Sequence, residues 1–277
     1  MNINSLLTES AGQVAGAIVI AVLAFMLGSF RRAIIQRIRT RQTRKYWSPF
    51  RGRGIAIVLG SFSPSSPPSS ERHRAIDMSP IQDFEPYGLV GFGEVLALLA
   101  LQEHMKLVGL DDVTVAQPTD VRTIRSKHLV LVGGPDPNAV TDLAMHYGQL
   151  PVRFTDHVNS RTKMHVTFPG KDGSEPDEQV YTPAFLPDKP GQLARDYGFV
   201  AQVPSPYSEE CTAILLVGVY GAGTVAAAQL VTSSYGVSRM RRVNMGRCLA
   251  IFRADVGRSG DISSPRIERC EALDERH

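Results

Sequence analysis

The 277-residue chain contains little cysteine, and its three cysteines, Cys211, Cys248 and Cys270, form no CxxC pair. An odd number of unpaired cysteines predicts reduced thiols in a cytosolic environment and argues against a zinc ribbon. The seven histidines form no HExxH motif and no cluster with cysteine at ligand spacing, so no metal site is expected. The GxGxxG and GxxxxGK[ST] signatures are absent as well, which leaves the identity of any cofactor open.

The net positive charge of the chain is concentrated in one short segment. No lysine or arginine precedes Arg31, and residues 31–53 then carry nine basic residues and no acidic one. The remainder, 54–277, has a net charge of about −5, so a surface for nucleic acid is not expected. With 43% hydrophobic and 21% charged residues, the chain is long enough for one sizeable α/β domain with accessory elements.

Residues 12–30, GQVAGAIVIAVLAFMLGSF, contain no charged side chain. A helix of this length spans roughly 28 Å, about the hydrocarbon thickness of a bilayer. Because the basic residues follow the apolar run, the positive-inside rule predicts a single-pass helix with its N-terminus outside and the main domain in the cytoplasm. Gly12 and Gly16 form a GxxxG pair, which favours self-association as a homo-oligomer.

The basic segment 31–53 has two interpretations. It either docks on anionic lipid, where each basic residue contributes about 1 kcal/mol, or it only flanks the membrane helix, with Tyr46 and Trp47 as interfacial aromatic residues. The expected organisation is therefore a tail and membrane span at 1–30, this basic segment, and a cytoplasmic domain at 54–277. A loop rich in serine and proline is predicted at 63–74 inside that domain.

Short apolar runs alternate with helical patterns through the cytoplasmic part. Strands are predicted at 54–62, 112–116, 128–132, 197–204, 211–220 and 248–256, and helices at 88–110, 138–148 and 224–234, with a short helix or turn near 118–125. Residues 151–182 alternate polar and apolar side chains, which predicts an antiparallel excursion. The fold class expected is a Rossmann-like, mostly parallel α/β sheet with this excursion.

Three glycine-bearing loops stand at strand-to-helix junctions. The first combines Gly60 with residues 87–94, the second is GGPDPN at 133–138, and the third is GVYGAGT at 218–224. Such junctions share one edge of a parallel sheet, so we expect the three loops to border one crevice.

The third loop is the better candidate for a phosphate. Gly221 and Gly223 permit close backbone approach, and Thr224 is expected to act as an N-cap or a hydroxyl donor. Tyr220 would stack on a base. The alternative is that the glycines serve only close helix–strand packing and that the tyrosine lines the surface.

The second loop is a poor phosphate cradle, because its two prolines remove amide donors and Asp136 adds negative charge. Gly133, Gly134 and Asn138 are its candidate ligand-binding residues. Asp136 would accept ribose hydroxyls or act as a general base; alternatively it belongs to an Asx turn in which Asn138 caps the next helix.

Glu94, in the first loop, has two interpretations as well. Paired with Asp136 it would form two carboxylates suited to cleaving an N-glycosidic bond through an oxocarbenium-like transition state. Alone, an acidic residue in the first turn of a helix complements the helix dipole.

The stretches GFGE, GGPDPN and GVYGAGT resemble the loops of Rossmann-like nucleotide-recognising proteins: the SLOG superfamily, nucleoside deoxyribosyltransferase-like domains and TIR-like domains of bacterial defence and signalling systems. The resemblance covers roughly 54–256 in outline. It implies a membrane-anchored cytoplasmic domain that binds a nucleotide or nucleoside-derived ligand, as a sensor or as an N-glycosidic hydrolase. The alternative is a non-enzymatic, membrane-tethered scaffold, and enzymatic activity stays open between the two.

Overall fold

The computed structural model describes residues 40–61, 90–157, 160–169, 175–189, 191–243 and 247–273. The predicted membrane span at 12–30 and the predicted loop at 63–74 lie outside these residues. Among the residues that are described, no helix combines the length and apolar character needed to cross a bilayer. The described residues from Gln42 onward form one structural unit.

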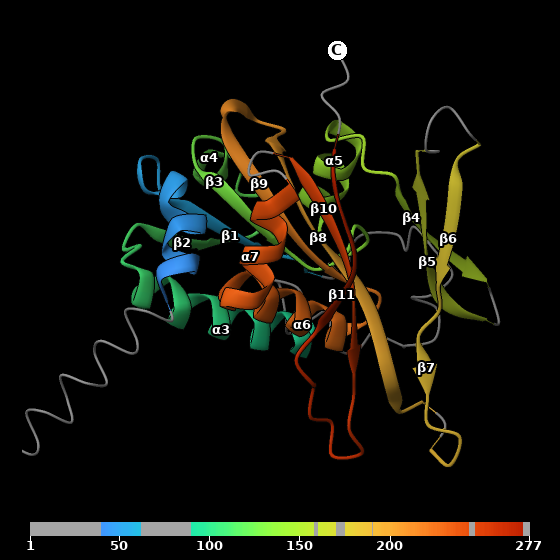
Figure 1. Ribbon diagram of the computed structural model, residues 1–277. Helices are drawn as coiled ribbons and strands as arrows, with labels where there is room; N and C mark the ends of the chain where they lie inside the picture. Colours follow the sequence, from blue (N-terminus) through green and yellow to red (C-terminus); the bar gives the residue numbers. More distant parts are fainter. Residues whose placement is uncertain are drawn as a thin grey trace, which may run out of the picture. The chain divides into compact units, whose positions relative to one another are not determined.

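A mixed eight-stranded sheet forms the centre of this unit, with its main strands in the order β11-β10-β8-β9-β3-β1-β2 (Figure 1). Neighbouring strands are parallel across β9 (Ser208–Gly218), β3 (His128–Val132), β1 (Ile55–Leu59) and β2 (Val113–Ala116). The antiparallel part contains β8 (Leu193–Ser205), β10 (Cys248–Asp255), β11 (Arg266–Ala272) and the short β7 (Ala184–Phe185).

The parallel strands are buried along their length because both faces of the sheet are covered. All five residues of β3 are buried, and so are the first four of β1. Alternate residues enter two different cores: Ile55 and Ile57 pack on one side, and Ala56 and Val58 on the other. This two-sided burial explains why these strands read as continuous apolar runs.

Helices cover one face, and a smaller sheet with two helices covers the other (Figure 1). The first face carries α3 (Phe92–Val108), α6 (Gly221–Thr232), α7 (Ser234–Val243) and the helical residues 42–47 with η1 (Ser48–Arg51). The second carries α4 (Val121–Ile124), α5 (Ala139–Tyr147) and an antiparallel sheet of β4 (Val152–His157), β5 (Ser160–Phe168) and β6 (Asp177–Tyr181).

The aromatic residues of the basic segment belong to the core. Tyr46 is 4% exposed and Trp47 is 1% exposed, and the indole Nε1 of Trp47 donates a hydrogen bond to the Val231 carbonyl at 3.1 Å. The interpretation of these two side chains as interfacial aromatic residues is therefore corrected. The structural unit begins at 42, whereas the end of the basic segment predicted a domain boundary at 54. The charge of that segment does not reveal which of its aromatic side chains are buried.

The α/β class, the parallel strands and the antiparallel excursion are confirmed, the last as the three-stranded sheet β4-β5-β6. The direction of one predicted later strand, β8, differs from the prediction. Strand β8 joins β9 through the turn at 206–207, which is too short for a parallel crossover, and β10 pairs antiparallel to β8. Strand β11 and helix α7 were not expected, since their sequences, RIERCEA and SYGVSRMRRV, are strongly charged.

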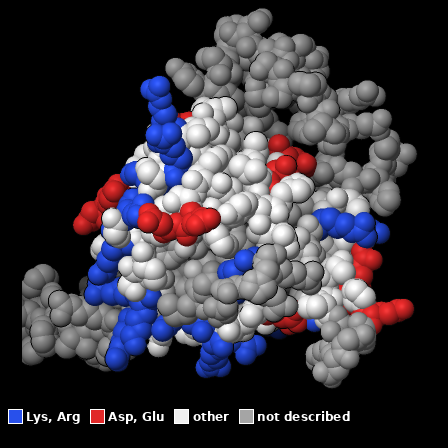
Figure 2. Space-filling view, turned by 90° about the horizontal axis from the view of Figure 1, so that it is seen from above, with Lys and Arg blue, Asp and Glu red and all other residues white. Residues whose placement is uncertain are grey.

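Charged side chains of both signs lie around the rim of the molecule in the view of Figure 2, and the middle of that view is largely uncharged. Several basic groups lie together along the lower left edge of this view, and acidic groups lie above them and at the right.

Candidate functional site

The three predicted loops meet at the edge where the parallel strands end. The Gly60 amide donates to the Val132 carbonyl at 3.1 Å, and the Ser61 amide donates to the Pro137 carbonyl at 2.8 Å. The Gly133 amide donates to the Leu216 carbonyl at 3.1 Å. These bonds join the ends of β1, β3 and β9, as the parallel order leads one to expect.

The first turn of α3 connects the loops further. The Glu94 carboxylate lies against Gly133, where an added Cβ would be 3.3 Å from Oε1, and Gly133 has a positive φ of 99°. Gly93 packs on Gly221 so closely that an added Cβ would meet the Gly221 carbonyl oxygen at 2.5 Å. Glycine is required at Gly133 by conformation and at Gly93 by the contact between the α3 and α6 termini.

The two candidate catalytic carboxylates lie on the same edge in different environments. Glu94 is half-buried beside the start of the 133–138 loop, whereas Asp136 is exposed in the turn of that loop. The turn is closed by a hydrogen bond from the Asn138 amide to the Gly134 carbonyl at 3.2 Å. Asp136 therefore lies three residues along the chain from Gly133, the glycine that the Glu94 carboxylate contacts.

Asn138 is buried, and its side chain is fully used inside the protein. Its Nδ2 donates to the carbonyls of Val58 and Val132 at 3.1 and 3.3 Å, and its Oδ1 accepts from the amides of Val140 and Thr141 at 3.2 and 3.3 Å. These bonds tie the ends of β1 and β3 to the start of α5. The alternative in which Asn138 caps the helix is confirmed, and all its side-chain hydrogens are committed to this role.

Sequence reasoning missed Asp196, which is fully buried in β8 next to the third loop. Its Oδ2 accepts from the Tyr220 amide at 3.2 Å and the Gly223 amide at 2.6 Å, and its Oδ1 accepts from the Tyr197 amide at 2.9 Å. Burial raises the pKa of the Asp196 carboxyl to about 7, although the three N–H bonds favour its charged form. Asp196 therefore holds the N-terminus of α6.

This carboxylate occupies amides that were expected to bind a phosphate. Gly223 is also packed tightly, since an added Cβ would meet the Tyr197 carbonyl oxygen at 2.6 Å. Thr224 is 2% exposed and lies inside α6, whose N-cap is Tyr220. The role of Thr224 as an N-cap is thus corrected, and Gly223 fits the packing alternative. Gly221 is exposed and Tyr220 half-buried.

The only sequence signal for Asp196 is an isolated acid at the start of an apolar strand, in RDYGFVAQV. That pattern does not distinguish a buried carboxylate from an exposed one. Tyr220 likewise gave no sign of its partner: its ring packs edge-on against Phe185 of β7, with centroids 5.7 Å apart.

No protein-family model matches the chain, and no curated protein matches it. The site is consequently defined by its own geometry. In the part of the chain that the structure describes, no group of three or more His, Cys, Asp or Glu side chains is placed to hold a metal ion. The chemistry available at the loop edge is that of Glu94, Asp136, the Gly134 backbone, Gly221 and Tyr220.

Proposed function

We propose that the loop edge binds a nucleotide or nucleoside-derived ligand, with Glu94 and Asp136 contacting its ribose. The observation that carries the proposal is the contact of the Glu94 carboxylate with Gly133, which joins the loops after β1 and β3. The chain leaves β1 toward β2 on one side and leaves β3 toward β9 on the other. Ligands of open α/β sheets bind at such a switch point, outside the carboxyl ends of the strands.

The reaction class that suits two carboxylates here is hydrolysis of an N-glycosidic bond. The bond between C1′ and the base nitrogen breaks, the base keeps the electron pair, and the oxygen of a water molecule bonds to C1′. The proton released goes to the base, or to solvent when the base is a pyridinium. Half-buried Glu94 would stabilise positive charge at C1′, and exposed Asp136 would accept the proton of the attacking water.

In this proposal the segment 12–30 anchors the domain to the cell membrane, with the main domain in the cytoplasm and the basic residues near anionic lipid. The ligand would then be a cytosolic signal or substrate. The resemblance to defence and signalling domains supports this placement.

A thermal-shift panel tests the binding step. Nucleosides, ATP, ADP-ribose, NAD and cyclic dinucleotides are added to the full chain in detergent, and a ligand at 100 times its Kd should stabilise the protein by about 2.7 kcal/mol. We expect Glu94→Gln and Asp136→Asn to raise at least tenfold the ligand concentration needed for a given thermal shift. Glu103→Gln, on an exposed turn of the same helix as Glu94, should leave that concentration unchanged. Absence of a shift with the whole panel contradicts the proposal.

One observation supports the alternative of a non-enzymatic scaffold. The outer side of α3 exposes an apolar row in which Phe92 is 76% and Leu99 57% exposed, with Val95 and Leu96 between them. Large exposed apolar patches mark protein-binding surfaces. Under this alternative Glu94→Gln and Asp136→Asn preserve cellular function, whereas Gly16→Leu disturbs assembly.

A further inference from the structure

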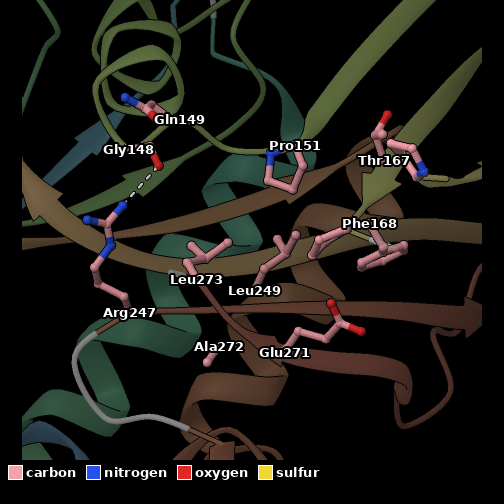
Figure 3. Close-up of a pocket in the computed structure, with 12 residues that line it drawn as sticks. Gly148, Gln149, Pro151, Thr167, Phe168, Arg247, Leu249, Glu271, Ala272 and Leu273 are labelled. Atoms are coloured by element: carbon pink, nitrogen blue, oxygen red, sulfur yellow. Dashed lines mark hydrogen bonds between the residues drawn. The ribbon is translucent and has the colours of Figure 1, made fainter. Parts of the chain in front are cut away.

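A cavity of about 180 Å³ lies between the start of β10, the end of β11 and the end of the smaller sheet (Figure 3). Strand β10 is antiparallel to β8, which is antiparallel to β9, so β10 and β9 run in the same direction. The beginning of β10 therefore lies at the sheet edge opposite the three loops. This cavity is separate from the proposed nucleotide site.

The floor of the cavity is apolar. Leu249 and Phe168 are each 1% exposed, and Leu273 and Pro151 stand beside them (Figure 3). Leu249 pairs with Glu271 across β10 and β11. Because side chains alternate along a strand, Arg247, Leu249, Glu271 and Leu273 all project from the same face of the sheet.

Arg247 stands at one side of the cavity, and Glu271 stands at another (Figure 3). The Nη2 of Arg247 donates to the Gly148 carbonyl at 3.3 Å, and its Nε is buried without a hydrogen-bond partner among the described residues. No described carboxylate lies within ion-pair distance of it. A guanidinium has five N–H donors, so most of its capacity is unused by the described residues.

The neighbouring Arg269 provides a contrast. Its Nε donates to Glu271 at 2.6 Å, its Nη1 to Asp177 at 3.1 Å, and its guanidinium lies 3.4 Å from the centre of the Phe168 ring. Glu271 is therefore already paired, and among the described residues that line the cavity Arg247 is the cation without a carboxylate partner. A guanidinium beside an apolar floor is suited to an apolar molecule that ends in a carboxylate.

We propose that this cavity binds a small monocarboxylic acid, whose carboxylate contacts Arg247 and whose apolar body rests on Leu249 and Phe168. Size limits the ligand, since an engineered cavity of about 150 Å³ holds benzene; an acid of about ten non-hydrogen atoms fits. Charge limits it as well. One free guanidinium and the nearby Glu271 carboxylate disfavour a doubly charged phosphate.

The test is isothermal titration of benzoate, benzamide and phenyl phosphate into the full chain. Benzoate is expected to bind with a Kd of about 1 mM or tighter, and benzamide and phenyl phosphate at least tenfold more weakly. Equal binding of benzoate and benzamide, tighter binding of phenyl phosphate, or no benzoate binding at 10 times that concentration overturns the proposal.

Variants locate the site. Arg247→Gln should weaken benzoate binding at least tenfold. Arg266 is exposed at the far end of β11, and Arg266→Gln should leave benzoate binding unchanged. Leu273→Trp enlarges a half-buried side chain that lines the cavity on the same face as Leu249 and should block binding without unfolding the protein. Glu94→Gln should leave benzoate binding intact, which separates this site from the nucleotide site. Unchanged affinity in both Arg247→Gln and Leu273→Trp contradicts the assignment.

Discussion

At the scale of single residues, two buried polar side chains hold the loop edge together. Asn138 fixes the loop after β3, and Asp196 fixes the start of α6, each by bonding to backbone groups of neighbouring elements. Buried polar groups of this kind are costly unless every partner is present. They explain why the loops have definite positions while Asp136 and Gly221 remain exposed.

The role of Asp196 leads to a prediction for stability. Asp196→Ala removes the acceptor of three amides, two of them at the α6 terminus, and should lower the free energy of unfolding by about 3 kcal/mol. Urea unfolding followed by circular dichroism measures the change. Asp261→Ala, at an exposed position, is the control and should change stability by under about 0.5 kcal/mol. A loss for Asp196→Ala no larger than that of the control would show that the carboxylate does not hold this terminus.

Asp196 also predicts a pH effect of definite sign. Its folded-state pKa of about 7 is above the unfolded value of about 3.9, so its contribution to stability is fully present below pH 3.9 and is lost as the pH rises through 7.

At the scale of elements, α3 connects the loop edge to the core. It begins at Phe92, places Glu94 in its first turn and ends at Val108; the next residue, Gly109, has a φ of 76° and its amide donates to the Lys106 carbonyl. The inner side of the helix packs in the core. The outer side of its first half, from Phe92 to Leu99, is apolar as well, so this half is hydrophobic on both sides, a property of helices that are covered by a partner.

His104 makes α3 sensitive to acid. It is 7% exposed, its Nε2 has no partner among the described residues, and burial lowers the pKa of its imidazole to about 4. The folded pKa is below the unfolded value of about 6.5, so its stabilising contribution is present above pH 6.5 and is lost as the pH falls toward 4.

Thermal unfolding between pH 7 and pH 5 measures this effect. The wild-type Tm combines the opposite contributions of His104 and Asp196. We expect His104→Leu to remove the acid-induced loss, so that its Tm relative to wild type rises as the pH falls, while Asp196→Asn should show the reverse. A Tm difference between His104→Leu and wild type that does not vary with pH contradicts the assignment of His104.

At the scale of the whole molecule, the strands and helices around the site were predictable and the later sheet was not. Residues 55–59 and 128–132 form continuous apolar runs, which indicate buried strands. By contrast, β8 has the same apolar pattern whether it runs parallel or antiparallel to its neighbours, so only the short turn at 206–207 reveals its direction.

The site was predictable to a similar degree. Asn138 was identifiable because an asparagine before a helix is a frequent cap. Burial of Asp196 depends on the packing of β8 against the start of α6, and its partners Tyr220 and Gly223 lie 24 and 27 residues further along the chain, so no local pattern encodes it. The same is true of Arg247, whose surroundings are formed by the start of β10 and the ends of β11 and α5.

Hydrogen exchange with and without the best nucleotide of the thermal-shift panel tests the central claim most directly. The ligand should slow exchange in peptides that contain 91–95 and 133–138, and leave those containing 247–250 and 271–273 unchanged. Slowed exchange confined to peptides away from the loop edge, or equal protection in the Glu94→Gln variant, would contradict a ligand site at the ends of β1 and β3.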